Sequence, residues 1–378
     1  MRGLRNRSYS HWGDRRRYSF VVRGLHLDIP LTLGLVILAT IGLAILYSAG
    51  GTHPDIVNRQ LLRLCVAFVV MIIVAQIPPH QIELWAPWLF GIGLLLLLAV
   101  LVIGDEGKGA QRWLDLGLFR FQPSEIMKLA VPVMVAWYLS DSALPPTLTH
   151  ILQACFIIFI PALLIAKQPD LGTALLIASS GIFVLLLSGI RWKHVALFVA
   201  IVCVSAPLLW FNLHDYQKSR VMTFLNPEND ALGAGYHIIQ SKIAIGSGGI
   251  YGKGWLNGSQ SQLEFLPERS TDFIFAVFCE EFGFIGVILL LSLYMFIVVR
   301  GLFIATQAQD TFARLLAGSL ILTFFIYTFI NIGMVIGILP VVGLPLPLIS
   351  YGGTSMVTLM ASFGILMSVQ THRKLLPT

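Results

Sequence analysis

Hydrophobic residues gather in ten long runs along the chain, separated by polar stretches that are mostly short. A helix that crosses the hydrocarbon core of a bilayer needs about 20 apolar residues. Most of the runs approach that length, so the pattern predicts an all-α integral membrane protein with ten transmembrane helices. The predicted spans are 29–49, 61–77, 84–103, 127–140, 149–166, 171–189, 194–212, 273–299, 312–337 and 350–369.

Two of these spans depart from the regular pattern. The fourth is short, and we expect it to begin earlier, around Pro123, as a partly buried helix. The eighth is long enough to be tilted or to be interrupted at Gly283 or Gly286. A large extracytoplasmic loop, about 213–272, is predicted between helices 7 and 8, and a shorter outer loop covers about 104–126.

Arginines concentrate in front of the first apolar run, at Arg2, Arg5, Arg7, Arg15, Arg16, Arg17 and Arg23. A basic arm can bind nucleic acid, but before a membrane span it is typical of the cytoplasmic side. An even number of spans places both termini there. The predicted organisation is a cytoplasmic arm (1–28), a membrane domain (29–370) and a cytoplasmic tail (371–378), with no nucleic-acid partner.

The overall composition supports a membrane protein. Of the 378 residues, 56% are hydrophobic and 12% are charged, whereas about a quarter of a soluble domain is charged. The four cysteines (Cys65, Cys155, Cys203, Cys279) all lie within apolar runs. Their spacing fits neither a disulfide framework nor a metal site, so we predict a packing role for them and no metal ligands.

The remaining charged groups crowd at the predicted outer ends of the helices, where burial is costly and each group is a functional candidate. Snorkelling toward lipid headgroups can explain any single basic residue. For the basic residues as a group, binding of one anionic lipid headgroup is the simpler explanation, because it accounts for all of them together. Lys242, Glu268 and Arg269 belong to this set of charged groups and are candidate substrate contacts.

Asp272 stands where the large polar loop meets the eighth apolar run. If a helix begins at Phe273, Asp272 is its N-cap. The alternative is a carboxylate at the membrane–water boundary that acts as a general base, and the residues alone leave both interpretations open. Glu280 and Glu281 lie deeper in the same run and are predicted to bond polar groups on neighbouring helices as structural anchors.

Three further stretches have distinctive backbone chemistry. In "QPSE", Ser124 is a candidate helix cap. The glycine-rich "AIGSGGIYGKGW" lacks the Walker pattern, which favours a tightly turning loop over a phosphate cradle. Residues 337–353 are apolar but carry Pro340, Pro345 and Pro347, which exclude a regular helix. We predict that this segment forms a re-entrant wall of the site.

Five motifs together resemble the signature of the SEDS family (shape, elongation, division and sporulation). They are "GAQRWLDLG" with "RFQPSE", "QPDLGTA", "GAGYH" with "AIGSGG", "LPERSTDFIFA", and "PLPLISYGG". The resemblance runs from the first span to the C-terminus and leaves out the Arg-rich residues 1–25. It implies an inner-membrane peptidoglycan glycosyltransferase that polymerises lipid II on the periplasmic side during cell elongation. It also implies a class B penicillin-binding protein, the crosslinking transpeptidase, as partner.

The family's essential aspartate falls on Asp272, and further family positions fall on Arg59, Arg120, Lys128 and Gln217. The implied reaction is an inverting transfer to a sugar 4-hydroxyl with Asp272 as general base. A diphosphate leaves without a proton, so one base and cations around the departing charge are enough. A divalent cation, magnesium or manganese, stays open as a cofactor.

A lipid II flippase, or another amphiphile transporter, is the alternative function, since broken helices and intramembrane carboxylates suit that class too. Such a transporter needs a polar path to the inner side, whereas the polar candidates crowd at the outer ends. A third alternative is a protein that only scaffolds the transpeptidase, but that role would not explain the basic residues of the outer loops.

Overall fold

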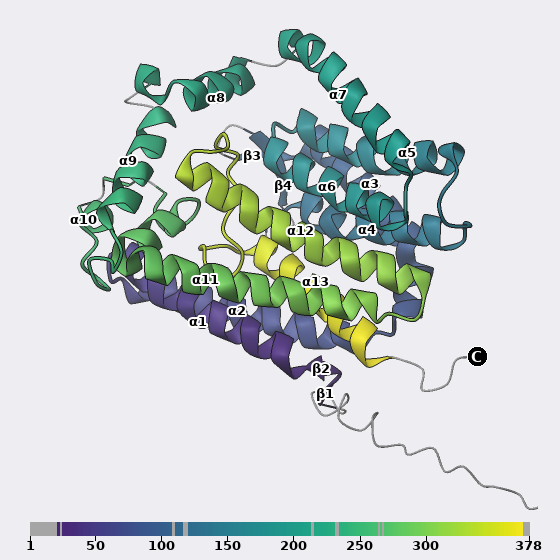
Figure 1. Cartoon of the computed structure of the whole chain (residues 1–378), viewed down its shortest axis with the longest axis horizontal. Helices are drawn as coiled ribbons and strands as arrows, with labels where there is room; N and C mark the ends of the chain where they lie inside the picture. Colours follow the sequence, from purple (N-terminus) through teal and green to yellow (C-terminus); the bar gives the residue numbers. More distant parts are fainter. Residues whose placement is uncertain are drawn as a thin grey trace, which may run out of the picture.

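The computed structural model describes residues 21–22, 25–107, 110–115, 120–212, 215–230, 234–263, 265–266 and 268–372. Long helices make up most of this part of the chain (Figure 1). They are α1 (Ile29–Ala49), α2 (Pro54–Ala75), α3 (Pro79–Ile103), α4 (Pro123–Ser140), α5 (Leu148–Lys167), α6 (Leu171–Leu187), α7 (Trp192–Asn212), α11 (Ile274–Thr306), α12 (Thr311–Ile336) and α13 (Thr354–Thr371).

Each predicted span corresponds to one of these helices, and α4 begins at Pro123 as expected. Among the described residues, seven helices are long and apolar enough to cross a membrane, namely α1, α2, α3, α5, α11, α12 and α13. Large apolar side chains such as Leu33, Trp88 and Val102 are exposed on helix surfaces. Exposed apolar surface on this scale suits contact with lipid.

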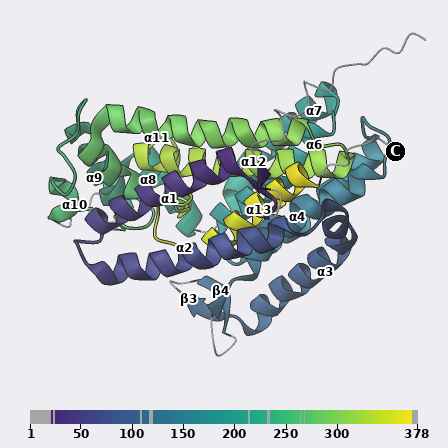
Figure 2. The same cartoon turned by 90° about the horizontal axis from the view of Figure 1, so that it is seen from below.

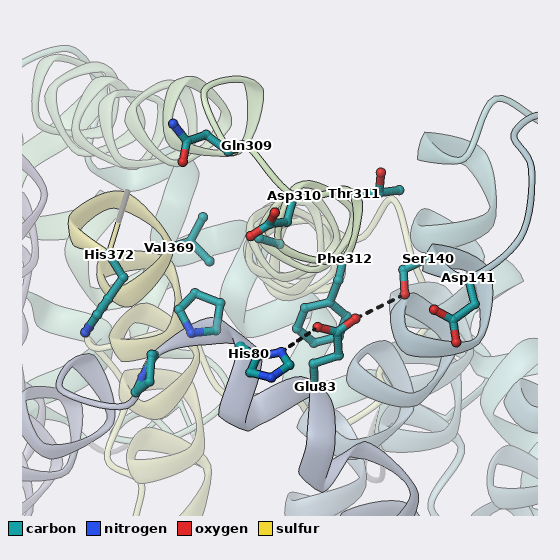
Figure 3. A pocket seen from close by; sticks show the side chains of 13 residues that line it. His80, Glu83, Ser140, Asp141, Gln309, Asp310, Thr311, Phe312, Val369 and His372 are labelled. Atoms are coloured by element: carbon teal, nitrogen blue, oxygen red, sulfur yellow. Dashed lines mark hydrogen bonds and ion pairs between the residues drawn. The ribbon is translucent and has the colours of Figure 1, made fainter. Parts of the chain in front are cut away.

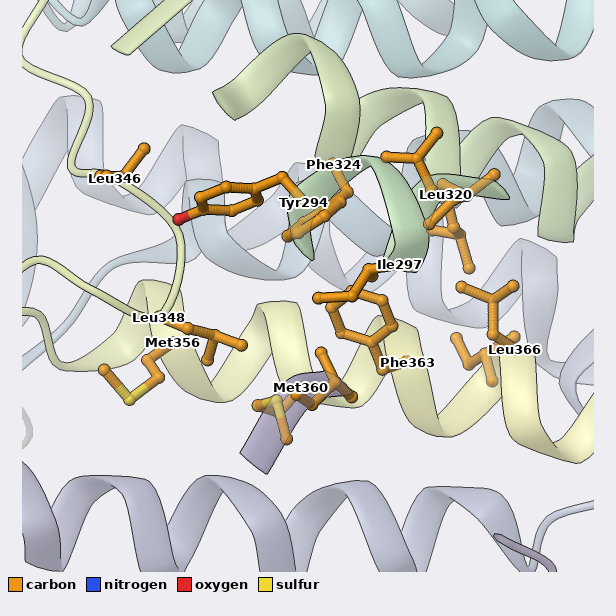
Figure 4. Close-up of a cluster of buried hydrophobic side chains, with 14 of the residues drawn as sticks. Tyr294, Ile297, Leu320, Phe324, Leu346, Leu348, Met356, Met360, Phe363 and Leu366 are labelled. Carbon is orange, nitrogen blue, oxygen red and sulfur yellow. The ribbon is translucent and has the colours of Figure 1, made fainter. Parts of the chain in front are cut away.

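The core lies where α11, α12 and α13 pack against one another and against α1 and α2. Tyr294 of α11, Phe324 of α12 and Phe363 of α13 form its aromatic centre, with ring centroids 5.8 and 5.1 Å apart in succession (Figure 4). Close approach depends on small residues. A Cβ on Gly364 of α13 would lie 2.6 Å from the carbonyl oxygen of Met71 in α2, which is typical of membrane helix interfaces.

Contacts between the ends of α1 and α11 define the relative direction of these two helices. Asp28, which caps α1, accepts hydrogen bonds of 2.6 and 3.0 Å from Arg300 late in α11. Ser48, near the other end of α1, donates to Glu281 near the start of α11. The two helices are therefore antiparallel, and the start of α11 lies at the end of the bundle opposite the N-terminus of α1.

Short strands modify the all-α prediction. The loop between α3 and α4 contains β3 (Asp105–Gly107), β4 (Ala110–Asp115) and β5 (Arg120–Phe121) in antiparallel order, and Figure 2 shows β3 and β4 beside α3. Near the N-terminus, β1 (Val21–Val22) pairs with β2 (Leu27–Asp28). Backbone polar groups outside a helix still need partners, and a hairpin supplies them within a few residues.

The large loop also forms helices, α8 (Asp215–Leu225), a 3-10 turn η1 (Pro227–Asp230), α9 (Ala234–Ser247) and α10 (Ser259–Gln262). Its glycine-rich segment packs against a break in α11 at Gly283, which has φ +62° and ψ −164°. The amide of Phe284 donates to the carbonyl of Gly249, and the amide of Gly254 donates to the carbonyl of Glu281. The predicted interruption of this helix therefore occurs at Gly283, and loop backbone replaces the lost helical hydrogen bonds.

Candidate functional site

Asp272 lies in a turn, Glu268 to Phe273, immediately before α11. Of the two interpretations left open by the sequence, the helix cap is contradicted, because α11 begins at Ile274 and its N-cap is Phe273, which makes no side-chain cap bond. The turn is closed by backbone bonds from the amides of Thr271 and Phe273 to the carbonyl of Glu268, at 3.1 and 3.3 Å. Glu268 has φ +53°, a conformation that costs a non-glycine residue energy and is often found at functional sites.

The segment between α12 and α13, residues 337–353, holds this turn from one side. Asn331 of α12 is fully buried, and its Nδ2 donates to the carbonyl of Asp272 (3.1 Å) and to that of Leu344 (2.6 Å). Ser350 Oγ donates to the carbonyl of Thr271 at 2.6 Å. The backbone around Asp272 is thus bonded both to α12 and to the proline-rich segment.

That proline-rich segment has irregular backbone, as its three prolines require. Pro340 and Pro345 are half-buried and Pro347 is buried, where its carbonyl accepts a 2.7 Å bond from Tyr294. Gly343 has φ +75°, and a Cβ there would lie 3.6 Å from Asp272 Oδ2. The turn at Gly343 therefore brings backbone close to the Asp272 carboxylate.

Cations from α2 flank the same segment. The Arg63 guanidinium stands 4.5 Å from the ring centroid of Tyr351. One turn earlier, Gln60 is buried and exchanges hydrogen bonds with the carbonyl of Ser350 (3.1 Å) and the amide of Gly352 (3.3 Å). Arg59 is exposed on α2, also one turn before Arg63, and residues at this spacing share one helix face.

Arg269 approaches the corner between α1 and α2. Its Nη2 would lie 3.7 Å from a Cβ placed on Gly51. Lys242 of α9 approaches the start of the proline-rich segment, since a Cβ on Gly337 would meet its Cε at 2.4 Å. Three predicted substrate-contact residues from separate elements, Arg59, Arg269 and Lys242, are therefore placed around residues 337–353 and the α1–α2 corner.

A second group of charges is buried at the start of α4. Lys128 Nζ lies 2.8 Å from Glu125 Oε1, with side chains 12% and 6% exposed. Lys128 also stands 5.6 Å from the ring centroid of Tyr327. The prediction that Ser124 caps α4 is wrong, because the helix begins at Pro123 with Gln122 as N-cap. Ser124 Oγ and Glu125 Oε2 are instead buried without a hydrogen-bond partner among the described residues.

Asp170 links α6 to the loop between α3 and α4. It caps α6 by accepting from the amide of Thr173 (3.3 Å), and it also accepts from Gln122 Nε2 (3.1 Å). Arg112 of β4 lies 3.9 Å from Asp170, and its Nε donates to the carbonyl of Gln168 (3.2 Å). The partner of Asp170 is therefore Arg112 rather than the sequence neighbour Lys167.

Tyr327 of α12 lies beside both groups of residues. Its ring centroid is 5.6 Å from Lys128 Nζ, and it lines a small cavity together with Pro345 and Ser350 of the proline-rich segment. The sequence interpretation did not single out Tyr327 or Asn331. The sequence did contain a signal for both residues. An amide or a phenol inside an apolar run usually forms a hydrogen bond within the protein and is seldom exposed to lipid.

Two predicted substrate contacts are only partly defined. Arg120 begins β5 and Gln217 lies in α8, but their side chains are outside the described part of the structure. Glu268 is exposed, and its carboxylate accepts from Thr271 Oγ1 at 2.7 Å. Among the described residues, no group of three or more His, Cys, Asp or Glu is placed to hold a metal ion.

The two deep glutamates have different partners. Glu281 accepts from Ser48 of α1, as predicted for a bond to a neighbouring helix. The partners of Glu280 come from the large loop, not from the neighbouring membrane helices. Its Oε1 lies 2.7 Å from Lys253 Nζ, 3.0 Å from Ser259 Oγ and 3.1 Å from the amide of Gln260.

Comparison with known proteins identifies the family of this chain. A sequence profile described as cell cycle protein, which groups FtsW, RodA and SpoVE, matches residues 24–375. The chain belongs to this family. The peptidoglycan glycosyltransferase MrdB of Escherichia coli K12 is 56% identical over 353 residues, covering 93% of this chain and 95% of MrdB. Stage V sporulation protein E of Bacillus subtilis is 34% identical, covering 92% and 98% of the two chains.

Solved structures of the FtsW/RodA/SpoVE family share the fold. A chain from a peptidoglycan synthase complex that coordinates polymerization and crosslinking matches with a TM-score of 0.79 and 32% identity, covering 90% of this chain and 96% of that one. The rod shape determining protein RodA of Thermus thermophilus matches with a TM-score of 0.69 and 26% identity, covering 91% and 97%. The expected family and enzyme class are confirmed, and this chain is a glycosyltransferase of the inner membrane.

Proposed function

We propose that this chain polymerises lipid II into peptidoglycan strands and that Asp272 is the general base. The observation that carries the proposal is the placement of Asp272 just before a membrane helix, in a turn held from outside. Asn331 donates to the carbonyl of Asp272, and Ser350 donates to the carbonyl of Thr271. A base must be held in position to contribute its usual factor of about 10²–10⁴. The E. coli relative is named a peptidoglycan glycosyltransferase, which supports a peptidoglycan precursor as the substrate.

The reaction needs few groups. The Asp272 carboxylate accepts the proton of the attacking sugar 4-hydroxyl, whose oxygen displaces the lipid diphosphate from the anomeric carbon of a second lipid II. One displacement inverts the configuration and forms a β-1,4 bond. Because the diphosphate carries its own charge away, no acid is required, and cations nearby stabilise the transition state.

Cations are available on both sides of Asp272. Arg63 stands at the α2 side over Tyr351, with Arg59 one turn away. Lys128 stands at the α4 side over Tyr327. We infer that these groups bind the diphosphates of the two lipid II molecules. The buried, unpartnered Glu125 Oε2 and Ser124 Oγ supply further polar contacts beside Lys128 for a sugar or a peptide stem.

The proposed topology has ten membrane spans, with Asp272 and the large loop on the periplasmic side and both termini in the cytoplasm. It is supported by the antiparallel packing of α1 and α11, which separates Asp272 from Asp28 by the length of the bundle. Reporter fusions in the 213–272 loop and at the C-terminus test this topology. Signals from the same membrane face would contradict it.

A class B penicillin-binding protein is the proposed partner. The support is the similarity to a chain of a peptidoglycan synthase complex. The deciding experiment supplies fluorescent lipid II to the purified protein, with and without that partner, and resolves the glycan strands on a gel. Strands from the parent and none from Asp272→Asn support the proposal. Lipid II translocation across proteoliposomes without any polymer would favour the transporter instead.

A further inference from the structure

A cavity of about 440 Å³ opens at the end of the bundle opposite Asp272 (Figure 3). It lies where the start of α3, the end of α4, the start of α12 and the end of α13 converge. Its volume falls within the range of about 300–1,000 Å³ that is typical of ligand pockets. It has no part in the proposed transfer reaction, which takes place at the other end of these helices.

The lining of this cavity is acidic. Glu83, Asp141 and Asp310 contribute three carboxylates, and the described residues that line the cavity include no Lys or Arg. The Glu83 carboxylate lies 3.5 Å from His80 Nδ1 and accepts from Ser140 Oγ at 3.4 Å. Figure 3 shows these side chains facing the same space from α3, α4 and α12. Such a pocket attracts a cation and repels an anionic lipid headgroup.

The N-terminal hairpin meets the rim of this pocket. His26, between β1 and β2, stacks on His372 with ring centroids 4.3 Å apart and an interplanar angle of 4°. His372 itself lines the cavity. Gln76 Nε2 donates to the carbonyl of Leu25 at 2.7 Å, which also holds the hairpin against the ends of the helices. The chain that precedes β1 therefore starts beside the pocket.

That preceding chain is basic. Residues 1–20 contain six arginines and one acidic residue, Asp14. Arg15, Arg16 and Arg17 come four to six residues before Val21, a reach of up to roughly 14–21 Å at about 3.5 Å per residue. A guanidinium binds carboxylates with two parallel hydrogen bonds, which makes arginine the best match for an acidic pocket.

We propose that the cavity is a docking site for arginine side chains of residues 1–20, the part of the chain's own N-terminal arm that precedes β1. The two are joined by a few residues, so their effective concentration reaches the millimolar range and modest affinity is sufficient. Docking ties the N-terminus to the ends of α3, α4 and α12. The arm then acts as an intramolecular clamp on the helices whose opposite ends carry Lys128 and Asn331.

Trypsin cleavage after Arg15–Arg17 measures docking in the full-length protein, because the protease cuts the arm only while it is released. The protein is placed in nanodiscs of neutral phosphatidylcholine and the fragments are followed by mass spectrometry. Asp141→Asn/Asp310→Asn should speed cleavage at least about tenfold, as expected for losing hydrogen bonds to charged groups. The matched control, Asp55→Asn, alters an exposed carboxylate on α2 at the other end and should leave the rate unchanged.

Two further measurements decide between occupants. Raising the salt concentration should release the arm of the parent, and Glu83→Gln alone should act in the same direction as the double variant, which guards against a folding defect. Equal cleavage rates in the parent and both pocket variants overturn the proposal. The proposal is also overturned if the arm resists trypsin only after anionic phosphatidylglycerol is added, and to the same degree in all variants. The membrane surface, and not the cavity, would then hold the arm.

Discussion

Replacing Asp272 with Asn tests the proposed general base directly. The substitution keeps the size and shape of the side chain but removes its ability to accept the proton. The expected loss of polymerisation rate is about 10²–10⁴-fold. Each tenfold change corresponds to about 1.36 kcal/mol of activation free energy, so the predicted cost is roughly 2.7–5.4 kcal/mol.

The structure predicts a much smaller effect on folding. The side chain of Asp272 does not cap α11, whose N-cap is Phe273. The bond that Asn331 makes goes to the backbone carbonyl of Asp272, which the substitution leaves in place. The Asn side chain also keeps an oxygen that can accept the hydrogen bonds made to the carboxylate. We therefore expect the free energy of unfolding to change by less than about 1 kcal/mol.

The assay compares strand synthesis from fluorescent lipid II at matched amounts of folded protein, with the melting temperature and partner binding measured in parallel. Glu228→Gln is the matched control, because it removes the charge of an exposed carboxylate in η1 that is not assigned to the site. If the Asp272→Asn protein makes strands at nearly the parental rate, Asp272 is not the base. If it is inactive only because it no longer folds or binds its partner, the reasoning about the turn is refuted.

Four further variants test other parts of the structure. Lys128→Met should lower thermal stability because it leaves Glu125 buried and unpaired, at a cost of about 3–5 kcal/mol. Glu125→Gln/Lys128→Met should recover part of that stability but no polymerisation, and recovery of activity would exclude Lys128 as a diphosphate contact. Glu280→Ala should also lower thermal stability, but by less, because the Lys253 left behind is 31% exposed and still bonds Ser259. Activity per folded molecule should stay near the parental value; loss of activity at unchanged melting temperature would assign Glu280 to the site. Burial lowers the pKa of His372 below its ordinary value of 6.5, so the folded protein favours the neutral ring. The stability that neutral His372 contributes is complete above about pH 6.5 and is lost as the pH falls toward the pKa of His372 in the folded protein. His372→Gln should therefore weaken the pH dependence of the melting temperature.

The sequence by itself determined the class of fold and most of the helix boundaries. Each apolar run became a helix, and the first matches its predicted span, Ile29–Ala49, at both ends. The reason is physical, since a backbone in hydrocarbon must satisfy its polar groups locally and a helix does so within one segment. The break at Gly283 and the irregular segment after α12 were also readable, because glycine and proline act on the backbone directly.

Only the tertiary structure decided how the site is held. The starts of α11 and α4 lie a residue or two from the positions that would make Asp272 and Ser124 their N-caps, so neither residue has that role. The bond from Asn331 to the carbonyl of Asp272 joins residues 59 positions apart. No local pattern encodes such a contact, because it depends on how α11 and α12 pack. The pairing of Asp170 with Arg112 and the acidic pocket at the opposite end likewise exist only where separate helix ends meet.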